Sequence, residues 1–99
     1  MLFTSSVSVA TYNANVKGEI ASVITYADGD YIYFTLKNQP QHEACNPSFF
    51  VISESVSENR KNNLLSRLLT AYAMKEAVNI GYDSKGECVH GYIRAHRVG

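Results

Sequence analysis

The chain has 99 residues, which corresponds to a single domain spanning 1–99. Nine basic and nine acidic side chains cancel, and this argues against a nonspecific nucleic-acid binder, whose phosphate affinity comes from a surplus of Lys and Arg. No apolar run approaches the roughly 20 residues that a membrane-spanning helix needs, so we expect no membrane insertion.

The N-terminal segment 1–15 is predicted to be an arm or edge strand. Residues 3–10 are rich in Ser and Thr and alternate weakly in apolar character. The segment ends in small residues, as a signal peptide does, but no basic residue precedes its apolar part. We therefore expect a structural strand, with the remnant of a removed leader as the alternative.

Two strands joined by a tight turn are predicted next. Residues 16–27 alternate, and one face consists of Ile20, Ser22, Ile24 and Tyr26. Asp28-Gly29-Asp30 is a strong hairpin signal, and residues 31–37 return as the second strand. In this strand the side chains expected to face the core are Ile32, Phe34 and Leu36, and those expected to face away are Tyr31, Tyr33 and Thr35.

Residues 48–53 are predicted as a third strand of nearly continuous apolar character, and a helix follows from 55 to 75. Ser55 with Glu58 fits a capping box, and Ser57 fits a cap equally well. The helix ends near Lys75 without the usual glycine. The apolar face that should pack on the core consists of Leu64, Leu65, Leu68, Leu69, Tyr72 and Ala73. A basic, solvated face carries Arg60, Lys61, Asn62, Arg67 and Lys75.

Residues 77–82 are predicted as a fourth strand and residues 87–98 as a single fifth strand. Three strands, a helix and two strands is the order of an OB-type five-stranded Greek-key barrel, in which the helix between strands three and four plugs one end. The predicted fold class is therefore mainly β with one helix, an OB-fold-like barrel with an extra N-terminal strand allowed.

The order and spacing of several short motifs over about 17–97 resemble a known family. These motifs are Gly18-Glu19-Ile20, Tyr33-Phe34-Thr35-Leu36, Ala44-Cys45, the helix run from Leu64 to Tyr72, Val78-Asn79-Ile80, Cys88 and Tyr92-Ile93-Arg94. Together they resemble the small OB-fold B subunits of subtilase-type and pertussis-like AB5 toxins. The resemblance implies an exported protein, secreted or periplasmic, with a cytoplasmic location as the alternative. It also implies a ring-forming homo-oligomer that binds a glycan without catalysis. It also implies a disulfide between Cys45 and Cys88.

The cysteines have a second interpretation. His42, Cys45, Cys88 and His90 carry metal-ligand chemistry, and the spacings His42-x-x-Cys45 and Cys88-x-His90 would suit zinc if the loops meet. A disulfide with two nearby histidines excludes that site. We expect the disulfide, and hence no metal and no cofactor.

No catalytic signature is recognisable. The sequence has no G-x-S-x-G, no phosphate-binding glycine loop and no paired-carboxylate motif, so we expect no enzyme.

A basic and aromatic strand face is the candidate ligand site. It consists of Tyr31, Tyr33, His90, Tyr92, Arg94 and His96. Tyrosine rings can stack on a sugar while Arg pairs with a carboxylate, but OB barrels also use such faces for single-stranded nucleic acid, and a subunit interface fits too. We expect a non-catalytic, self-associating, glycan-binding module; the alternatives are a single-stranded nucleic-acid-binding domain and a structural oligomer.

Overall fold

The structure is a computed structural model that describes residues 12–86 and 88–99. Its elements are β1 (Ala14–Thr25), β2 (Ile32–Leu36), β3 (Asn46–Ile52), α1 (Glu58–Met74), β4 (Ala77–Tyr82), β5 (Cys88–Val89), β6 (Tyr92–Arg94) and β7 (Arg97–Val98). A mainly β chain with one helix between the third and fourth strands is thus confirmed. The strand predicted over 3–10 lies outside the described residues. No helix in the described part is long and apolar enough to cross a membrane.

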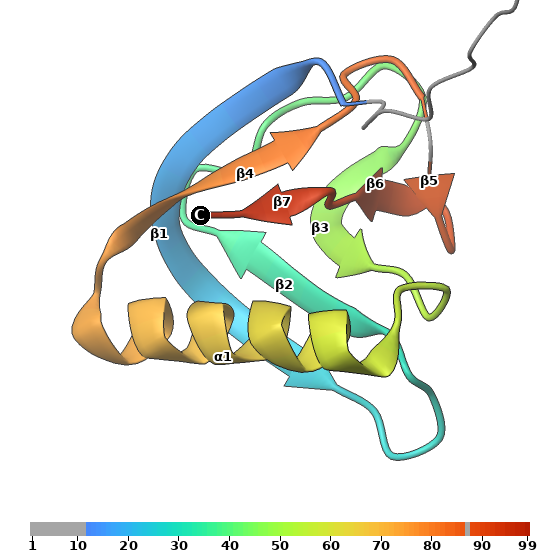
Figure 1. The fold of residues 1–99 in the computed structure, drawn as a ribbon. Coiled ribbons are helices and arrows are strands. Elements are labelled where there is room, and N and C mark those ends of the chain that lie inside the picture. Colours follow the sequence, from blue (N-terminus) through green and yellow to red (C-terminus); the bar gives the residue numbers. More distant parts are fainter. Residues whose placement is uncertain (1–11, 87) are drawn as a thin grey trace, which may run out of the picture.

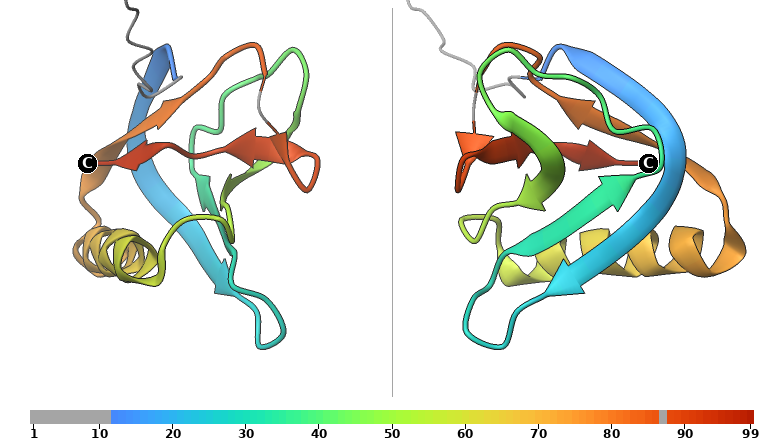
Figure 2. Two further views of the ribbon diagram at one scale, coloured as in Figure 1. Left: turned by 45° about the vertical axis from the view of Figure 1, so that its right-hand side comes forward. Right: turned by 180° about the vertical axis from the view of Figure 1, so that it is seen from behind.

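All seven strands form one curved sheet in the order β5-β6-β3-β2-β1-β4-β7 (Figure 1). β3 and β6 run parallel, and the other neighbours are antiparallel. β1 pairs with β4 through residues 14–19 and with β2 through residues 20–25, so this one long strand bends around the interior. α1 lies along the sheet, and the β1–β2 hairpin extends past the helix (Figure 2).

The C-terminal segment corrects the prediction of a single strand over 87–98. The chain reverses at His90 and Gly91, whose φ angles of 53° and 84° are both positive. A two-residue hairpin turn of type I′ requires positive φ at both central residues. The reversal pairs β5 with β6, and the expected five strands become seven.

A two-residue link connects β6, the second strand from one edge of the sheet, with β7 at the other edge. Ala95 and His96 separate β6, which lies beside β3, from β7, which lies beside β4. The amide of Ala95 donates to the carbonyl oxygen of Val51 at 2.9 Å, and the amide of His96 donates to that of Gly81 at 2.8 Å. The link therefore bonds to β3 on one side and to β4 on the other.

β1 contains a bulge that changes which side chains share a face. Ile20 pairs with Leu36, but Ser22 pairs with Thr35, so one extra residue lies between them on β1. Such a bulge shifts the alternation by one position. Ile20 and Val23 consequently pack on the core, and the prediction that Ile20 and Ser22 share a face is wrong.

The structure shows which residues cap the two ends of α1. Ser57 is the N-cap, and its hydroxyl accepts from the amide of Arg60 at 3.4 Å. The hydroxyl of Ser55 instead bonds to that of Ser53 at 2.9 Å. At the other end Lys75 adopts a left-handed conformation, with φ 55°, where glycine is usual.

The core lies between α1 and the inner side of the sheet. Phe34, Phe50 and Ile93 are fully buried there together with Leu68. The predicted leucine face of the helix is only partly correct, because the exposed side chains include Leu69 and Tyr72 as well as Met74. The basic face needs the opposite correction: Lys61 is 9% exposed, since this position turns its aliphatic stem toward the protein.

Candidate binding face

Six ring side chains form a connected cluster on the side of the sheet that faces away from the core. We call this cluster the aromatic face; its members are Tyr26, Tyr31, Tyr33, Phe49, His90 and Tyr92. They come from β2, β3, β6 and the turns beside β1, β2 and β6. The sheet thus gathers rings that are up to 66 positions apart in the sequence, from Tyr26 to Tyr92.

Tyr33 is the centre of the aromatic face. Its ring centroid lies 5.4 Å from Tyr26, 5.6 Å from Tyr31, 5.5 Å from Phe49 and 5.4 Å from Tyr92. The ring planes meet at 56–68° in these four pairs, the tilted and edge-to-face geometry that aromatic pairs favour. The rings around Tyr33 therefore support one another and leave their outer sides to solvent.

Strand alternation explains this placement. In β2 the burial alternates strictly, so Phe34 enters the core while Tyr33 points outward. Tyr33 pairs in register with Val51, and Val51 pairs with Arg94. Val51 is fully buried yet lies outside the core cluster, because the rings of the outer side cover it.

His90 and Glu54 form one rim of the aromatic face. The His90 ring lies 4.7 Å from Tyr31, and its Nε2 atom is 3.2 Å from a carboxylate oxygen of Glu54. The positive φ of His90 aims the side chain from the β5–β6 turn toward β2. The rim therefore offers a carboxylate and an imidazole next to stacked rings.

The surroundings shift the pKa of two groups here. Burial raises the pKa of the Tyr33 hydroxyl above 10.0, and the neighbouring Tyr26, Tyr31, Tyr92 and Glu54 add to the shift. The pKa of Glu54 is lowered from 4.5, chiefly by its own backbone amide and then by the hydrogen bond and charge of His90. Neutral pH therefore gives a neutral hydroxyl at the centre and a carboxylate at the rim.

The structure brings together four of the six predicted ligand residues, Tyr31, Tyr33, His90 and Tyr92. Arg94 lies in the same cross-strand row, next to Val51. His96 is elsewhere: it stacks on Tyr12 at 5.8 Å and lines a hollow beside α1.

Three residues of this region were not among the predicted ligand residues. Tyr26 extends the outer face past the β1 bulge, and Phe49 precedes the core residue Phe50, so a strict alternation would have placed it outside. Glu54 carries no sequence signal, because only folding brings it to the turn at His90.

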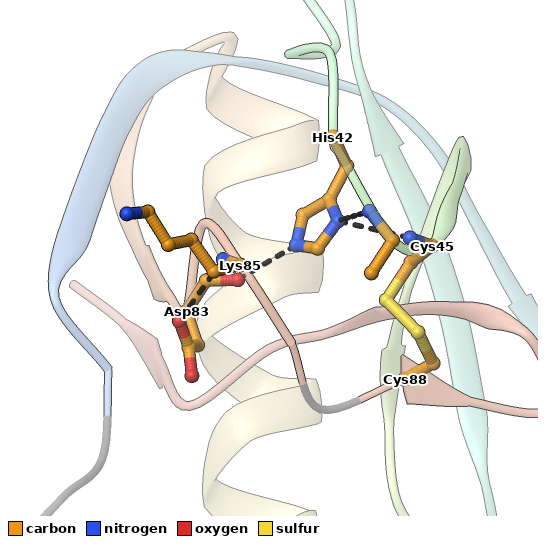
Figure 3. The surroundings of a disulfide bond; sticks show 6 residues. His42, Cys45, Asp83, Lys85 and Cys88 are labelled. Carbon is orange, nitrogen blue, oxygen red and sulfur yellow. Dashed lines mark hydrogen bonds between the residues drawn. A yellow bond between two sulfur atoms is a disulfide. The ribbon is translucent and has the colours of Figure 1, made fainter.

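The predicted disulfide between Cys45 and Cys88 is present, with the sulfurs 1.98 Å apart (Figure 3). His42 lies beside it: Nδ1 accepts from the amides of Ala44 and Cys45, and Nε2 donates to the carbonyl oxygen of Asp83 at 2.7 Å. His42 thus ties the loop before β3 to the turn after β4. Since both sulfurs are bonded to each other, they are not available as zinc ligands.

Comparisons of the chain with protein-family models, with curated proteins and with solved structures find no match. No relative therefore assigns a role to the aromatic face.

Proposed function

We propose that this chain is a non-catalytic binding module whose aromatic face contacts a glycan. The connected rings around Tyr33 carry the proposal. A pyranose offers an apolar C–H side that packs on such rings and hydroxyl groups at its edge. Glu54 and the tyrosine hydroxyls can exchange hydrogen bonds with those groups, in the usual combination of apolar lining and a few polar contacts.

A single-stranded nucleic acid is the weaker candidate because of the charges near the rings. Glu54 is a rim carboxylate with half of its side chain exposed, and it would repel a phosphate backbone. Arg94 is the cation in the central row, whereas strand-binding grooves follow the backbone with many positive charges. A neutral glycan meets no such repulsion.

The fold component of this proposal is an OB-type barrel. β6 and β7 would together act as its fifth strand, because only Ala95 and His96 separate them and their amides bond to β3 and β4. The remaining pairings of β1 with β2 and β4, and of β2 with β3, follow the order expected of that barrel.

We further propose that the module is a homo-oligomer in an oxidising compartment, either secreted or periplasmic. The disulfide supports the compartment, because such bonds persist outside the cytosol. The exposed apolar residues Leu69, Tyr72 and Met74 on α1 are one surface that self-association would cover. Removing residues 1–10 should lower the mass of the oligomer in light scattering if that segment pairs with a neighbour.

A glycan array probed with the wild type, Tyr92→Ala and Tyr12→Ala tests the proposal. Tyr92 belongs to the aromatic face, while Tyr12 is a half-buried tyrosine outside the face that stacks on His96. We expect the wild type and Tyr12→Ala to bind the same glycans and Tyr92→Ala to lose them. Silence on the array, together with oligonucleotide binding that weakens steeply with salt, would replace the glycan by a nucleic acid.

A further inference from the structure

A small hollow borders the aromatic face on the side of the β1–β2 hairpin. It lies between this hairpin and the start of α1, and its volume is about 130 Å³. This volume is below the usual range of sites that enclose a whole small molecule, so the hollow can take one substituent of a ligand but not a complete sugar ring. The residues that line it include Gly29, Asp30, Tyr31, Glu58, Lys61 and Asn62.

Tyr31 belongs to both the hollow and the aromatic face. Within the face its ring lies 5.3 Å from Tyr26 and 4.7 Å from His90. The same ring lies so close to Gly29 that a Cβ atom at that position would collide with it. The ring is therefore held in place by its neighbours, and a sugar that packs on the aromatic face lies next to the hollow.

Lys61 is the strongest hydrogen-bond donor in the lining. The residue is only 9% exposed, yet no hydrogen bond or ion pair of its ammonium group is found within 12–86 and 88–99. Its charge helps to lower the pKa of the Glu54 carboxyl, which places the ammonium group near the rim of the aromatic face. A nearly enclosed ammonium group with three unused donors gains from meeting an acceptor on a ligand, because little water competes there.

The charges of the lining favour a neutral ligand group. Asp30 and Glu58 contribute carboxylates beside Lys61, and Glu58 is three positions before Lys61, on the same side of α1. The carboxylates repel an anion and accept hydrogen bonds, whereas the ammonium group repels a cation and donates them. A group that satisfies both carries an acceptor and a donor without net charge. An acetamido group has this combination in its carbonyl oxygen and its N–H.

We propose that this hollow binds the acetamido group of an N-acetylated sugar whose ring packs on the aromatic face. Lys61 donates to the carbonyl oxygen, and the N–H group donates to the carboxylate of Asp30 or Glu58. A hydroxyl group at the same position of the sugar is shorter and would leave the ammonium group without an acceptor. The inference rests on the glycan proposal and narrows it to N-acetylated sugars.

Matched methyl glycosides test the ligand class in NMR titrations of the isotope-labelled full chain. The probes are the methyl glycosides of N-acetylglucosamine and N-acetylgalactosamine, and the controls are those of glucose and galactose, which carry a hydroxyl in place of the acetamido group. We expect at least one N-acetylated sugar to bind roughly 10-fold more tightly than its control and to move the amide signals of residues 29–30 and 61–62. Equal binding within both pairs, or no binding of either N-acetylated sugar, would overturn the inference. The glycan proposal is decided separately by the array, where binding of glycans that lack an acetamido group would leave it intact.

Lys61→Met tests the donor, and Lys85→Met is its control. Methionine keeps an apolar stem at the buried position and removes only the ammonium group, so the variant should fold. Lys85 is exposed in the turn after β4 and is not among the residues that line the hollow. We expect Lys61→Met to lose the preference for the N-acetylated sugar while it binds the control glycoside as the wild type does, and we expect Lys85→Met to keep the preference. A preference that persists in Lys61→Met would contradict the assignment. Tyr92→Ala should weaken binding of both sugars, which separates loss of the aromatic face from loss of the hollow.

Discussion

Phe49 and Phe50 are neighbours on β3 and have opposite environments. The Phe50 ring is fully buried and stacks on Phe34 at 5.3 Å inside the core. The Phe49 ring is half-buried on the outer side, where it meets Tyr33 and Tyr92 edge-on. The same residue type therefore serves the interior on one side of the sheet and an accessible surface on the other.

The aromatic residues of this small chain are thus distributed between the core and an outer surface. Inner rings are enclosed by aliphatic side chains such as Ile52 and Leu68, and their burial is part of what makes the chain fold. Outer rings are enclosed mainly by one another, and Tyr26 is still 45% exposed. Exposed rings held in place by their neighbours are suited to contact with another molecule.

The variants Phe50→Ala and Phe49→Ala should show the largest difference in stability between the inner and the outer side of the sheet. Removing the Phe50 ring leaves a cavity in the core and should lower the free energy of unfolding by about 3–5 kcal/mol. Removing the Phe49 ring breaks two outer ring contacts and should cost about 1–2 kcal/mol. Urea denaturation measures both. Equal losses would mean that the outer rings form a second core.

The disulfide should have the next largest effect. It connects Cys45, in the loop just before β3, with Cys88 in β5, which leads into the turn that carries His90. Replacing both cysteines by Ser opens a loop with a sequence separation of 43 and should cost about 4 kcal/mol in the chain-entropy model. Thermal unfolding with and without reductant checks this. An unchanged Tm after complete reduction would contradict it.

Lys75→Gly should increase stability without affecting either side of the sheet. Lys75 holds a left-handed conformation, with φ 55°, which glycine adopts without the steric conflict of a side chain. The free energy of unfolding should rise by about 1 kcal/mol, the cost of a left-handed conformation for a residue with a Cβ atom. Lys75→Ala is the control, because it keeps Cβ and should give no such gain. A stabilised variant with altered glycan binding would show that α1 belongs to the ligand site.

The smallest expected effect is the loss of the stabilising contribution of Glu54 as the pH becomes acidic. The pKa of the Glu54 carboxyl is lowered from 4.5 in the folded chain, so its stabilising contribution is present above the ordinary value that the carboxyl has in the unfolded chain. This contribution is lost as the pH falls through the lowered value. Urea unfolding of the wild type and Glu54→Gln should therefore differ at neutral pH and converge under acid. A difference that grows toward low pH would reverse the assigned sign.

The regular parts of the fold follow from the sequence. Alternation of apolar and polar residues in β2 correctly places Phe34 in the core and Tyr33 on the outer side. The order of strands and helix can be read from the sequence because each element has a clear strand or helix periodicity of apolar residues. The disulfide followed from family resemblance and not from spacing. Four of six predicted ligand residues meet because they lie on strands or turns of one outer side.

The irregular parts could not be predicted in the same way. The bulge after Ile20 and the reversal at His90 each change which side chains share a surface, and neither has a distinctive residue pattern. The exposure of Leu69 depends on where α1 lies against the sheet, which periodicity alone does not give. Glu54 reaches His90 across a sequence separation of 36, a contact that only the tertiary structure creates.

The most direct measurement is an NMR titration of the isotope-labelled full chain with a glycan that it binds on the array. If the aromatic face is the binding surface, the amide signals that move will be those of residues 31–33, 49–51 and 90–92. Signal changes confined to α1 would contradict glycan binding at the aromatic face.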